Sequence, residues 1–180
     1  MDKSILVLAY PGSGKTFMAE NYKDVSDLEF QHFRYDYGKY KNLPLEQLKG
    51  RSDIRKSNPE WPNNFFKFLE NELEKRKCVF VPMATSLFPI LDYLANEKNV
   101  RIIFVIQSED SLESMIETFK QRGNSKEFIE RRKNDFIKFH KLIKELPYEK
   151  FYLQQNEYLL DALKKNGIQF DVGKGFKNYI

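Results

Sequence analysis

Short apolar runs alternate with amphipathic segments along most of the chain, and this alternation predicts its secondary structure. The predicted strands are residues 5–9, 25–29, 78–82, 100–106 and 150–153. The predicted helices are residues 15–22, 65–75, 85–94, 110–123, 125–146 and 158–165, and residues 168–172 are a possible edge strand. Strands that alternate with helices cross over to parallel neighbours, so we expect an α/β fold with a mostly parallel sheet of five strands.

Residues 30–62 break this pattern, because they are polar and aromatic and show no clear period. Glycines and prolines recur in the segment, which predicts an irregular or helical excursion from the sheet. A long stretch without regular structure often has a functional role, so the excursion is a candidate for covering a substrate. A variable surface insertion is an equally reasonable interpretation.

Composition narrows the class of protein. A length of 180 residues predicts a single domain, residues 1–180, with one core. The 30 Lys and Arg exceed the 26 Asp and Glu by four, and this net charge of +4 does not favour nucleic acid as a partner, although it does not exclude it. Residues 5–9 are too short to span a membrane and no signal-peptide pattern precedes them, so we expect a cytoplasmic protein without a membrane partner. The single cysteine, Cys78, lies in an apolar run and is expected to be buried.

A phosphate-binding motif follows the first predicted strand. Residues 9–16 read Ala-Tyr-Pro-Gly-Ser-Gly-Lys-Thr, which fits the Walker A pattern except that Ala9 replaces the first glycine. Such a loop turns backbone N–H groups toward phosphates, and the helix that begins there adds the positive end of its dipole. We therefore expect ATP to bind at Pro11, Gly12, Ser13, Gly14, Lys15 and Thr16. In this arrangement Lys15 reaches the β- and γ-phosphates, and the Thr16 hydroxyl is a ligand for Mg²⁺.

Four segments together resemble the nucleoside monophosphate kinases, a group of P-loop phosphotransferases. They are the motif at 9–16 and the segments Val-Ser-Asp-Leu-Glu at 25–29, Asn-Pro-Glu-Trp-Pro at 58–62 and Gln-Arg-Gly-Asn-Ser-Lys-Glu-Phe-Ile at 121–129. The resemblance covers most of the chain and is strongest to the small deoxynucleoside-monophosphate-kinase-like proteins of bacteriophages and prophages. It implies a three-layer α/β/α P-loop NTPase fold with a helical lid, and ATP- and Mg²⁺-dependent transfer of a phosphoryl group to a nucleoside or deoxynucleoside monophosphate.

The resemblance also implies roles for individual residues. In this family a residue near the end of the second strand faces the acceptor, a position that Asp27 and Glu29 occupy here. A mobile lid carries arginines to the transferred phosphate, which implies a lid at about residues 117–132 with Arg122 and Arg131 as its catalytic arginines, together with Arg132. Lys15 and Glu29 complete the predicted catalytic set, and Arg122 is also expected to contact the nucleotide.

Other candidates for the acceptor site lie in the excursion. Arg51 and Arg55 are one helical turn apart and could hold the phosphate of the acceptor. Trp61 could stack on a base, although packing against Pro59 and Pro62 is the more frequent role of such a side chain. His32 and His140 have no ligand-like companions in the sequence, so a zinc site is not expected.

Two alternative functions remain open. The predicted strand 78–82 ends in Val-Pro and lacks the Walker B carboxylate that steadies Mg²⁺ in many P-loop enzymes, so Asp27 or Glu29 would have to help. Without such help, the chain could be a non-catalytic ATP-binding module. The segment Arg34-Tyr35-Asp36-Tyr37 is also similar to a segment of polynucleotide 5′-hydroxyl kinases, in which Asp36 would act as the general base.

Overall fold

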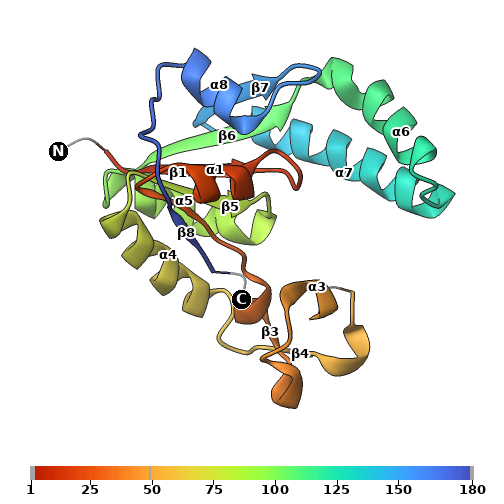
Figure 1. The fold of residues 1–180 in the computed structure, drawn as a ribbon, viewed down its shortest axis with the longest axis horizontal. Coiled ribbons are helices and arrows are strands. Elements are labelled where there is room, and N and C mark those ends of the chain that lie inside the picture. Colours follow the sequence, from red (N-terminus) through yellow and green to blue (C-terminus); the bar gives the residue numbers. More distant parts are fainter. Residues whose placement is uncertain (1–2, 49, 179–180) are drawn as a thin grey trace.

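A computed structural model describes residues 3–48 and 50–178 of the chain. The strands of its central sheet are β1 (Ile5–Ala9), β2 (Val25–Asp27), β5 (Cys78–Pro82), β6 (Arg101–Gln107), β7 (Glu149–Leu153) and β8 (Phe176–Lys177). Their order is β7-β6-β1-β5-β2-β8, and every neighbouring pair is parallel. The protein is therefore an α/β protein, as predicted, with a sheet of six strands rather than five (Figure 1).

Helices cover both faces of this sheet. The longer ones are α1 (Lys15–Asn21), α4 (Asn63–Lys75), α5 (Phe88–Asn96), α6 (Leu112–Gln121), α7 (Lys126–Lys144) and α8 (Leu159–Lys165). Two short 3₁₀ turns, η3 (Thr85–Leu87) and η4 (Glu109–Ser111), precede α5 and α6. The first five predicted strands and the six predicted helices are confirmed, with ends that differ by a few residues.

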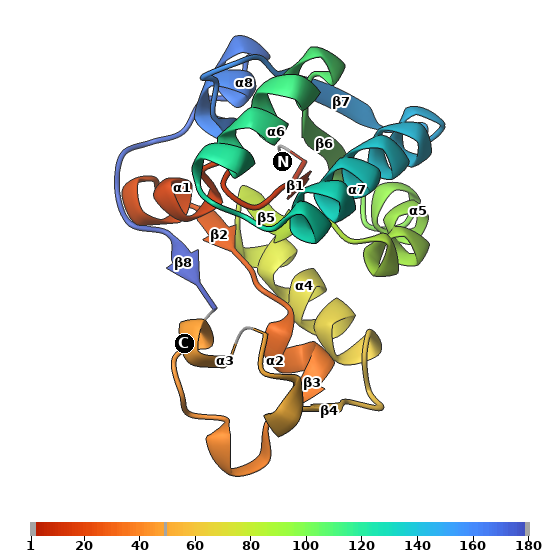
Figure 2. The same cartoon turned by 90° about the vertical axis from the view of Figure 1, so that its right-hand side faces the viewer.

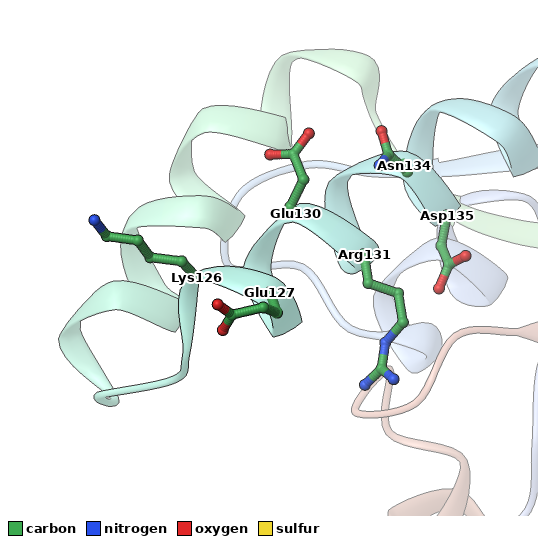
Figure 3. Close-up of a pocket in the computed structure, with 6 residues that line it drawn as sticks. All are labelled: Lys126, Glu127, Glu130, Arg131, Asn134 and Asp135. Atoms are coloured by element: carbon green, nitrogen blue, oxygen red, sulfur yellow. The ribbon is translucent and has the colours of Figure 1, made fainter.

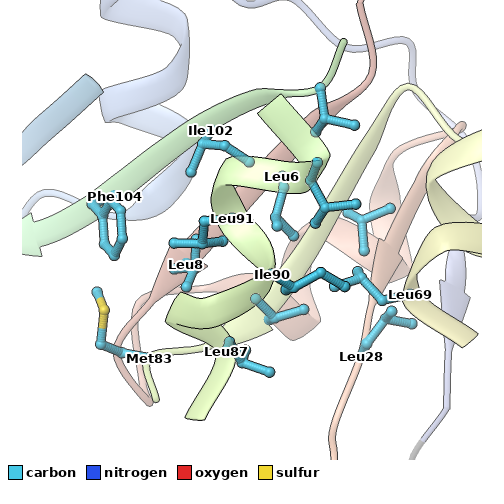
Figure 4. Packing of buried hydrophobic residues seen from close by; sticks show 14 of the residues in the cluster. Leu6, Leu8, Leu28, Leu69, Met83, Leu87, Ile90, Leu91, Ile102 and Phe104 are labelled. Atoms are coloured by element: carbon cyan, nitrogen blue, oxygen red, sulfur yellow. The ribbon is translucent and has the colours of Figure 1, made fainter. Parts of the chain in front are cut away.

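Alternation along the strands divides the core into two clusters. On β1, Leu6 and Leu8 pack with α4, α5 and the last turns of α7 (Figure 4). Ile5 and Val7 point to the opposite face, where they pack with α1 and α8. Cys78 lies in this second cluster, and its full burial confirms the prediction and raises the pKa of its thiol. The two clusters make the protein a three-layer arrangement with the sheet in the middle.

The excursion leaves the sheet after β2 and returns at α4. It contains α2 (Gln31–Arg34), β3 (Tyr35–Asp36), η1 (Gly38–Tyr40), α3 (Leu45–Leu48), η2 (Ser52–Ile54) and β4 (Lys56–Ser57). Strands β3 and β4 form a separate antiparallel ribbon. Figures 1 and 2 place this ribbon at the end of the molecule far from α6 and α7. The short helices and turns of the excursion make it irregular and partly helical, as predicted.

One predicted strand is wrong. Residues 168–172 alternate between apolar and polar side chains, but they form only an isolated bridge, between Val172 and Tyr22. Ile168 is instead buried beneath α8, and Phe170 packs edge-on against Tyr22. The edge strand is β8, a few residues further on, which pairs with β2.

Candidate functional site

The loop between β1 and α1 turns at two glycines with positive φ angles. Gly12 and Gly14 have φ angles of +80° and +102°, which side chains other than glycine rarely adopt. Gly14 is also the N-cap of α1, so the loop leads directly into the helix. Lys15 begins that helix with only 7% of its surface exposed, and its Nζ donates to the Tyr10 carbonyl oxygen over 3.1 Å. The lysine ammonium is therefore held along the loop and not in solvent.

A buried carboxylate lies beside the next residue of α1. The Thr16 hydroxyl donates to Oδ2 of Asp27 over 3.0 Å. Asp27 is the last residue of β2 and is 1% exposed. Because the carboxyl ends of parallel strands meet at one edge of the sheet, β2 delivers this carboxylate to the same edge as the β1–α1 loop. The contact places Asp27, which the sequence offered both for the acceptor site and as an aid to Mg²⁺, next to the predicted metal ligand.

A pocket of about 670 Å³ opens beside the β1–α1 loop. It lies at the edge of the sheet where the parallel strands end, which is where open α/β sheets bind ligands. Its walls come from the β1–α1 loop, the ends of β6 and β7, helices α6 and α7, and the β7–α8 loop. Polar groups on these walls include Gln107, Ser111, Ser114, Thr118, Gln154, Gln155 and Asn156.

Two buried polar atoms in this pocket make no hydrogen bond among the described residues. They are the Tyr10 hydroxyl and the Ser13 hydroxyl, both on residues that line the pocket. Burial raises the pKa of Tyr10, and the nearby charge of Asp135 raises it further, so the phenol stays protonated and is a donor. Buried polar groups are normally hydrogen-bonded, so these two hydroxyls are exceptions within the part of the chain that the structure describes.

The predicted lid arginines lie on the hairpin of α6 and α7. Arg122 caps the end of α6 and lines the pocket, as does Arg132 on α7. Arg131 instead lines an open hollow on α7, and in Figure 3 its side chain points toward the β1–α1 loop. The guanidinium carbons of Arg131 and Arg132 lie 5.6 and 5.2 Å from the centre of the Phe128 ring. This ring supports both arginines through cation–π contacts.

The predicted pairing of Arg51 and Arg55 on one helical face is wrong. Only the three residues of η2 separate them, and Arg55 already has the extended backbone that leads into β4. Arg51 makes two hydrogen bonds to the exposed carboxylate of Asp53, at 2.9 and 2.8 Å. Arg55 lies over the ring of Tyr35, with its guanidinium carbon 4.1 Å from the ring centre. Both arginines are therefore engaged within the excursion.

The other two acceptor candidates lie where the excursion joins the sheet. Trp61 is half-buried and packs on Phe30 and Phe65, with ring centres 5.2 and 5.9 Å apart, so its aromatic neighbours account for its position. Glu29 is also half-buried and lies two residues beyond the end of β2. Of the two residues predicted near the end of the second strand, only Asp27 therefore belongs to β2.

The two histidines lie on different elements, His32 on α2 and His140 on α7. His140 is buried on α7, where its ring nitrogens lie 2.8 Å from the Phe136 carbonyl oxygen and 2.7 Å from that of Gln107. It thereby ties α7 to the end of β6. Within residues 3–48 and 50–178, no group of three or more His, Cys, Asp or Glu side chains could hold a metal ion by itself.

Sequence reasoning missed most walls of the pocket. Tyr10, Gln107 and the segment 154–158 were not among the candidates. Gln107 and Gln154 nevertheless directly follow the predicted strands 100–106 and 150–153. That position was an available signal, since the residues after parallel strands gather at one edge. Asp135 carried no comparable signal, because a charged residue on a long helix is usually only exposed to solvent.

None of the helices in the described residues is long and apolar enough to cross a membrane. Comparisons of the chain with protein-family models, with curated proteins and with solved structures find no match.

Proposed function

We propose that the β1–α1 loop is a P-loop and that the protein is a phosphotransferase of the nucleoside monophosphate kinase type, with ATP as the donor. The observation that carries the proposal is the pairing of Thr16 with Asp27 at a glycine-bent loop that leads into a helix. The loop offers backbone N–H groups and the ammonium of Lys15 to the phosphates of the donor. The pocket beside it has the size of a site for a base and a ribose.

The residues around Thr16 fit a magnesium ion. Mg²⁺ prefers oxygen ligands and keeps several of its waters, so a hydroxyl and a neighbouring carboxylate are a suitable pair. Thr16 supplies the hydroxyl, and Asp27 supplies the negative charge that strand β5 lacks at its end. When bound, Mg²⁺ bridges phosphate oxygens and offsets their charge. Asp27 thus takes the place of a Walker B acid, which removes the main argument for a non-catalytic module.

Positive charge from the α6–α7 hairpin completes the site. Arg122 and Arg132 line the pocket, on the side where the donor would lie. Arg131 extends toward the β1–α1 loop from the neighbouring hollow on α7. Guanidinium groups can donate two hydrogen bonds to one phosphate, so these arginines are suited to stabilise the charge that spreads over the transferred group.

The acceptor is a nucleoside or deoxynucleoside monophosphate in this proposal. A 5′-hydroxyl acceptor would need a general base, and the candidate was Asp36. This residue is exposed on the β3–β4 ribbon, and its Oδ1 accepts from the Gly38 N–H over 2.8 Å. The ribbon is distant from the β1–α1 loop in both views of the fold, so Asp36 is a poor base for chemistry there (Figures 1 and 2). A monophosphate acceptor is already an anion and needs no such base.

Transfer from labelled ATP tests this proposal. The protein is incubated with each common nucleoside and deoxynucleoside monophosphate and, separately, with a 5′-hydroxyl oligonucleotide. We expect labelled diphosphate from at least one monophosphate and less product from the oligonucleotide. Asp36→Asn should leave the rate unchanged, whereas Glu29→Gln should lower it. Preference for the oligonucleotide would contradict the proposed acceptor, and ATP binding without any transfer would favour the non-catalytic module.

A further inference from the structure

Residues 173–178 cross the two elements that carry Thr16 and Asp27, and we call this segment the C-terminal clamp. On the side of α1, the Gly175 N–H donates to the Ala19 carbonyl oxygen over 2.8 Å. Lys177 adds an ion pair to Glu20 of the same helix, with Nζ 2.6 Å from Oε1. The clamp is therefore fixed to the helix that begins at Lys15.

On the side of β2, the clamp adds the strand β8. Its Phe176 and Lys177 pair with Ser26 and Asp27 in parallel register. Strand β2 has only three residues, and without β8 its outer edge would lack this partner. The clamp thus holds the strand that ends at the buried carboxylate on the side opposite β5.

Asn178 makes further hydrogen bonds at and beyond the end of β2. Its backbone N–H donates to the Asp27 carbonyl oxygen over 3.3 Å. Its side-chain amide then brackets Glu29: Oδ1 accepts from the Glu29 N–H over 2.5 Å, and Nδ2 donates to the Glu29 carbonyl oxygen over 2.9 Å. One side chain therefore fixes the backbone that follows the carboxylate.

The clamp approaches both elements so closely that Gly175 cannot carry a side chain. A Cβ on this residue would lie 2.4 Å from the carbonyl oxygen of Val25 and 2.9 Å from that of Tyr22. Both neighbours are backbone atoms on either side of the turn from α1 to β2, so they cannot move aside without disturbing that turn. The close fit locks helix and strand at one spacing.

We propose that the C-terminal clamp sets the distance between the Thr16 hydroxyl and the Asp27 carboxylate, and that Asn178 is a positioning residue for this pair. The inference rests on the proposed function, in which the pair holds Mg²⁺. A metal site needs its ligands held to a fraction of an ångström, and residues outside the site commonly provide this support. Asn178 acts through the backbone of residues 27–29 and does not touch the nucleotide itself.

Nucleotide affinity with and without Mg²⁺ tests the clamp. We define the magnesium coupling as the dissociation constant for ADP in EDTA divided by that in Mg²⁺, both from calorimetry. Asn178→Ala should lower the coupling about fivefold or more while leaving the affinity in EDTA unchanged. Gly175→Ala should lower it at least as much, and Lys174→Ala, an exposed change within the same segment, should not alter it.

The outcomes separate the two proposals. An unchanged coupling in Asn178→Ala and Gly175→Ala, together with a lower melting temperature, would show that the clamp only stabilises the fold and would overturn this inference. In that case the proposed function would stand, because the wild-type protein would still bind ADP with a measurable coupling. Absence of ADP binding by the wild-type protein would overturn both.

Discussion

Replacing Asp27 by asparagine removes the charge beside the Thr16 hydroxyl while leaving the shape of the buried side chain almost unchanged. A hydrogen bond to a charged group is worth about 1.5–3 kcal/mol, whereas one to a neutral group is worth about 1 kcal/mol. In the proposed site the carboxylate contacts the metal ion or its bound water, and Asp27→Asn removes this whole charge-assisted contact. At 1.36 kcal/mol for each factor of ten, Asp27→Asn should lower the magnesium coupling about 10- to 150-fold.

The fold itself should tolerate this change. Asp27 is almost fully buried, and the Thr16 hydroxyl can still donate to the amide oxygen of asparagine. We expect the melting temperature to stay within about 4 °C of the wild-type value, which corresponds to roughly 1 kcal/mol for a chain of this size. Asp24→Asn is the control, because it removes the same charge from an exposed turn three residues earlier.

Calorimetric titration of both variants with ADP, in EDTA and in Mg²⁺, measures the effect. An Asp27→Asn protein with the coupling of the wild type would refute the idea that this carboxylate replaces a Walker B acid. An equal loss in Asp24→Asn would instead assign the effect to net charge.

Two further predictions concern the lid and the sheet edge. Helix α6 has no buried residue, and the buried residues of α7 are Phe136, His140 and Ile143. The amides of residues 112–132 should therefore exchange faster than those of the central strands, and their exchange should slow down when ATP and Mg²⁺ are added. Protection of these amides equal to that of the strands in the free protein would contradict this prediction. Arg101 lowers the pKa of Glu149 through paired hydrogen bonds, at 2.6 and 2.7 Å, and through its charge. The ion pair stabilises the fold above the pKa of an unfolded glutamate, and this stabilisation is lost as the pH falls through the lower pKa of Glu149 in the folded state. Arg101→Met should therefore lower the free energy of unfolding in urea by about 0.5–1 kcal/mol at pH 7 and by much less near pH 3. A loss of stability independent of pH would contradict the ion pair.

The apolar runs predicted the sheet because a parallel strand that is buried on both faces consists almost entirely of apolar residues. Strand β5 is such a run, and all of its residues are buried. Strand β8 escaped prediction because it has only two residues and pairs on one side only. Residues 168–172 have the alternation of a strand, but Ile168 and Phe170 are apolar because they pack against other elements, and they form no ladder with a strand.

The sequence predicted those parts of the site whose residues are neighbours in the chain. The loop from Gly12 to Thr16 is one segment, and its geometry follows from its own glycines and the helix after it. The partner of Thr16 depends on where β2 lies in the sheet, which the sequence does not specify. The excursion was harder still, because Arg55 contacts the ring of Tyr35 and Trp61 that of Phe30, and both partners lie well before them in the chain.

We propose that ATP binds at the β1–α1 loop, and calorimetry of the wild-type protein beside Lys15→Ala measures this binding. Lys15 lies along the loop with its ammonium on the Tyr10 carbonyl oxygen, so its removal should weaken ATP binding in Mg²⁺ by about tenfold or more. The far-UV dichroism of the variant should match that of the wild type, and Lys23→Ala, an exposed change just beyond α1, should bind ATP normally. Equal affinity of Lys15→Ala and wild type, or no binding by either, would contradict the claim.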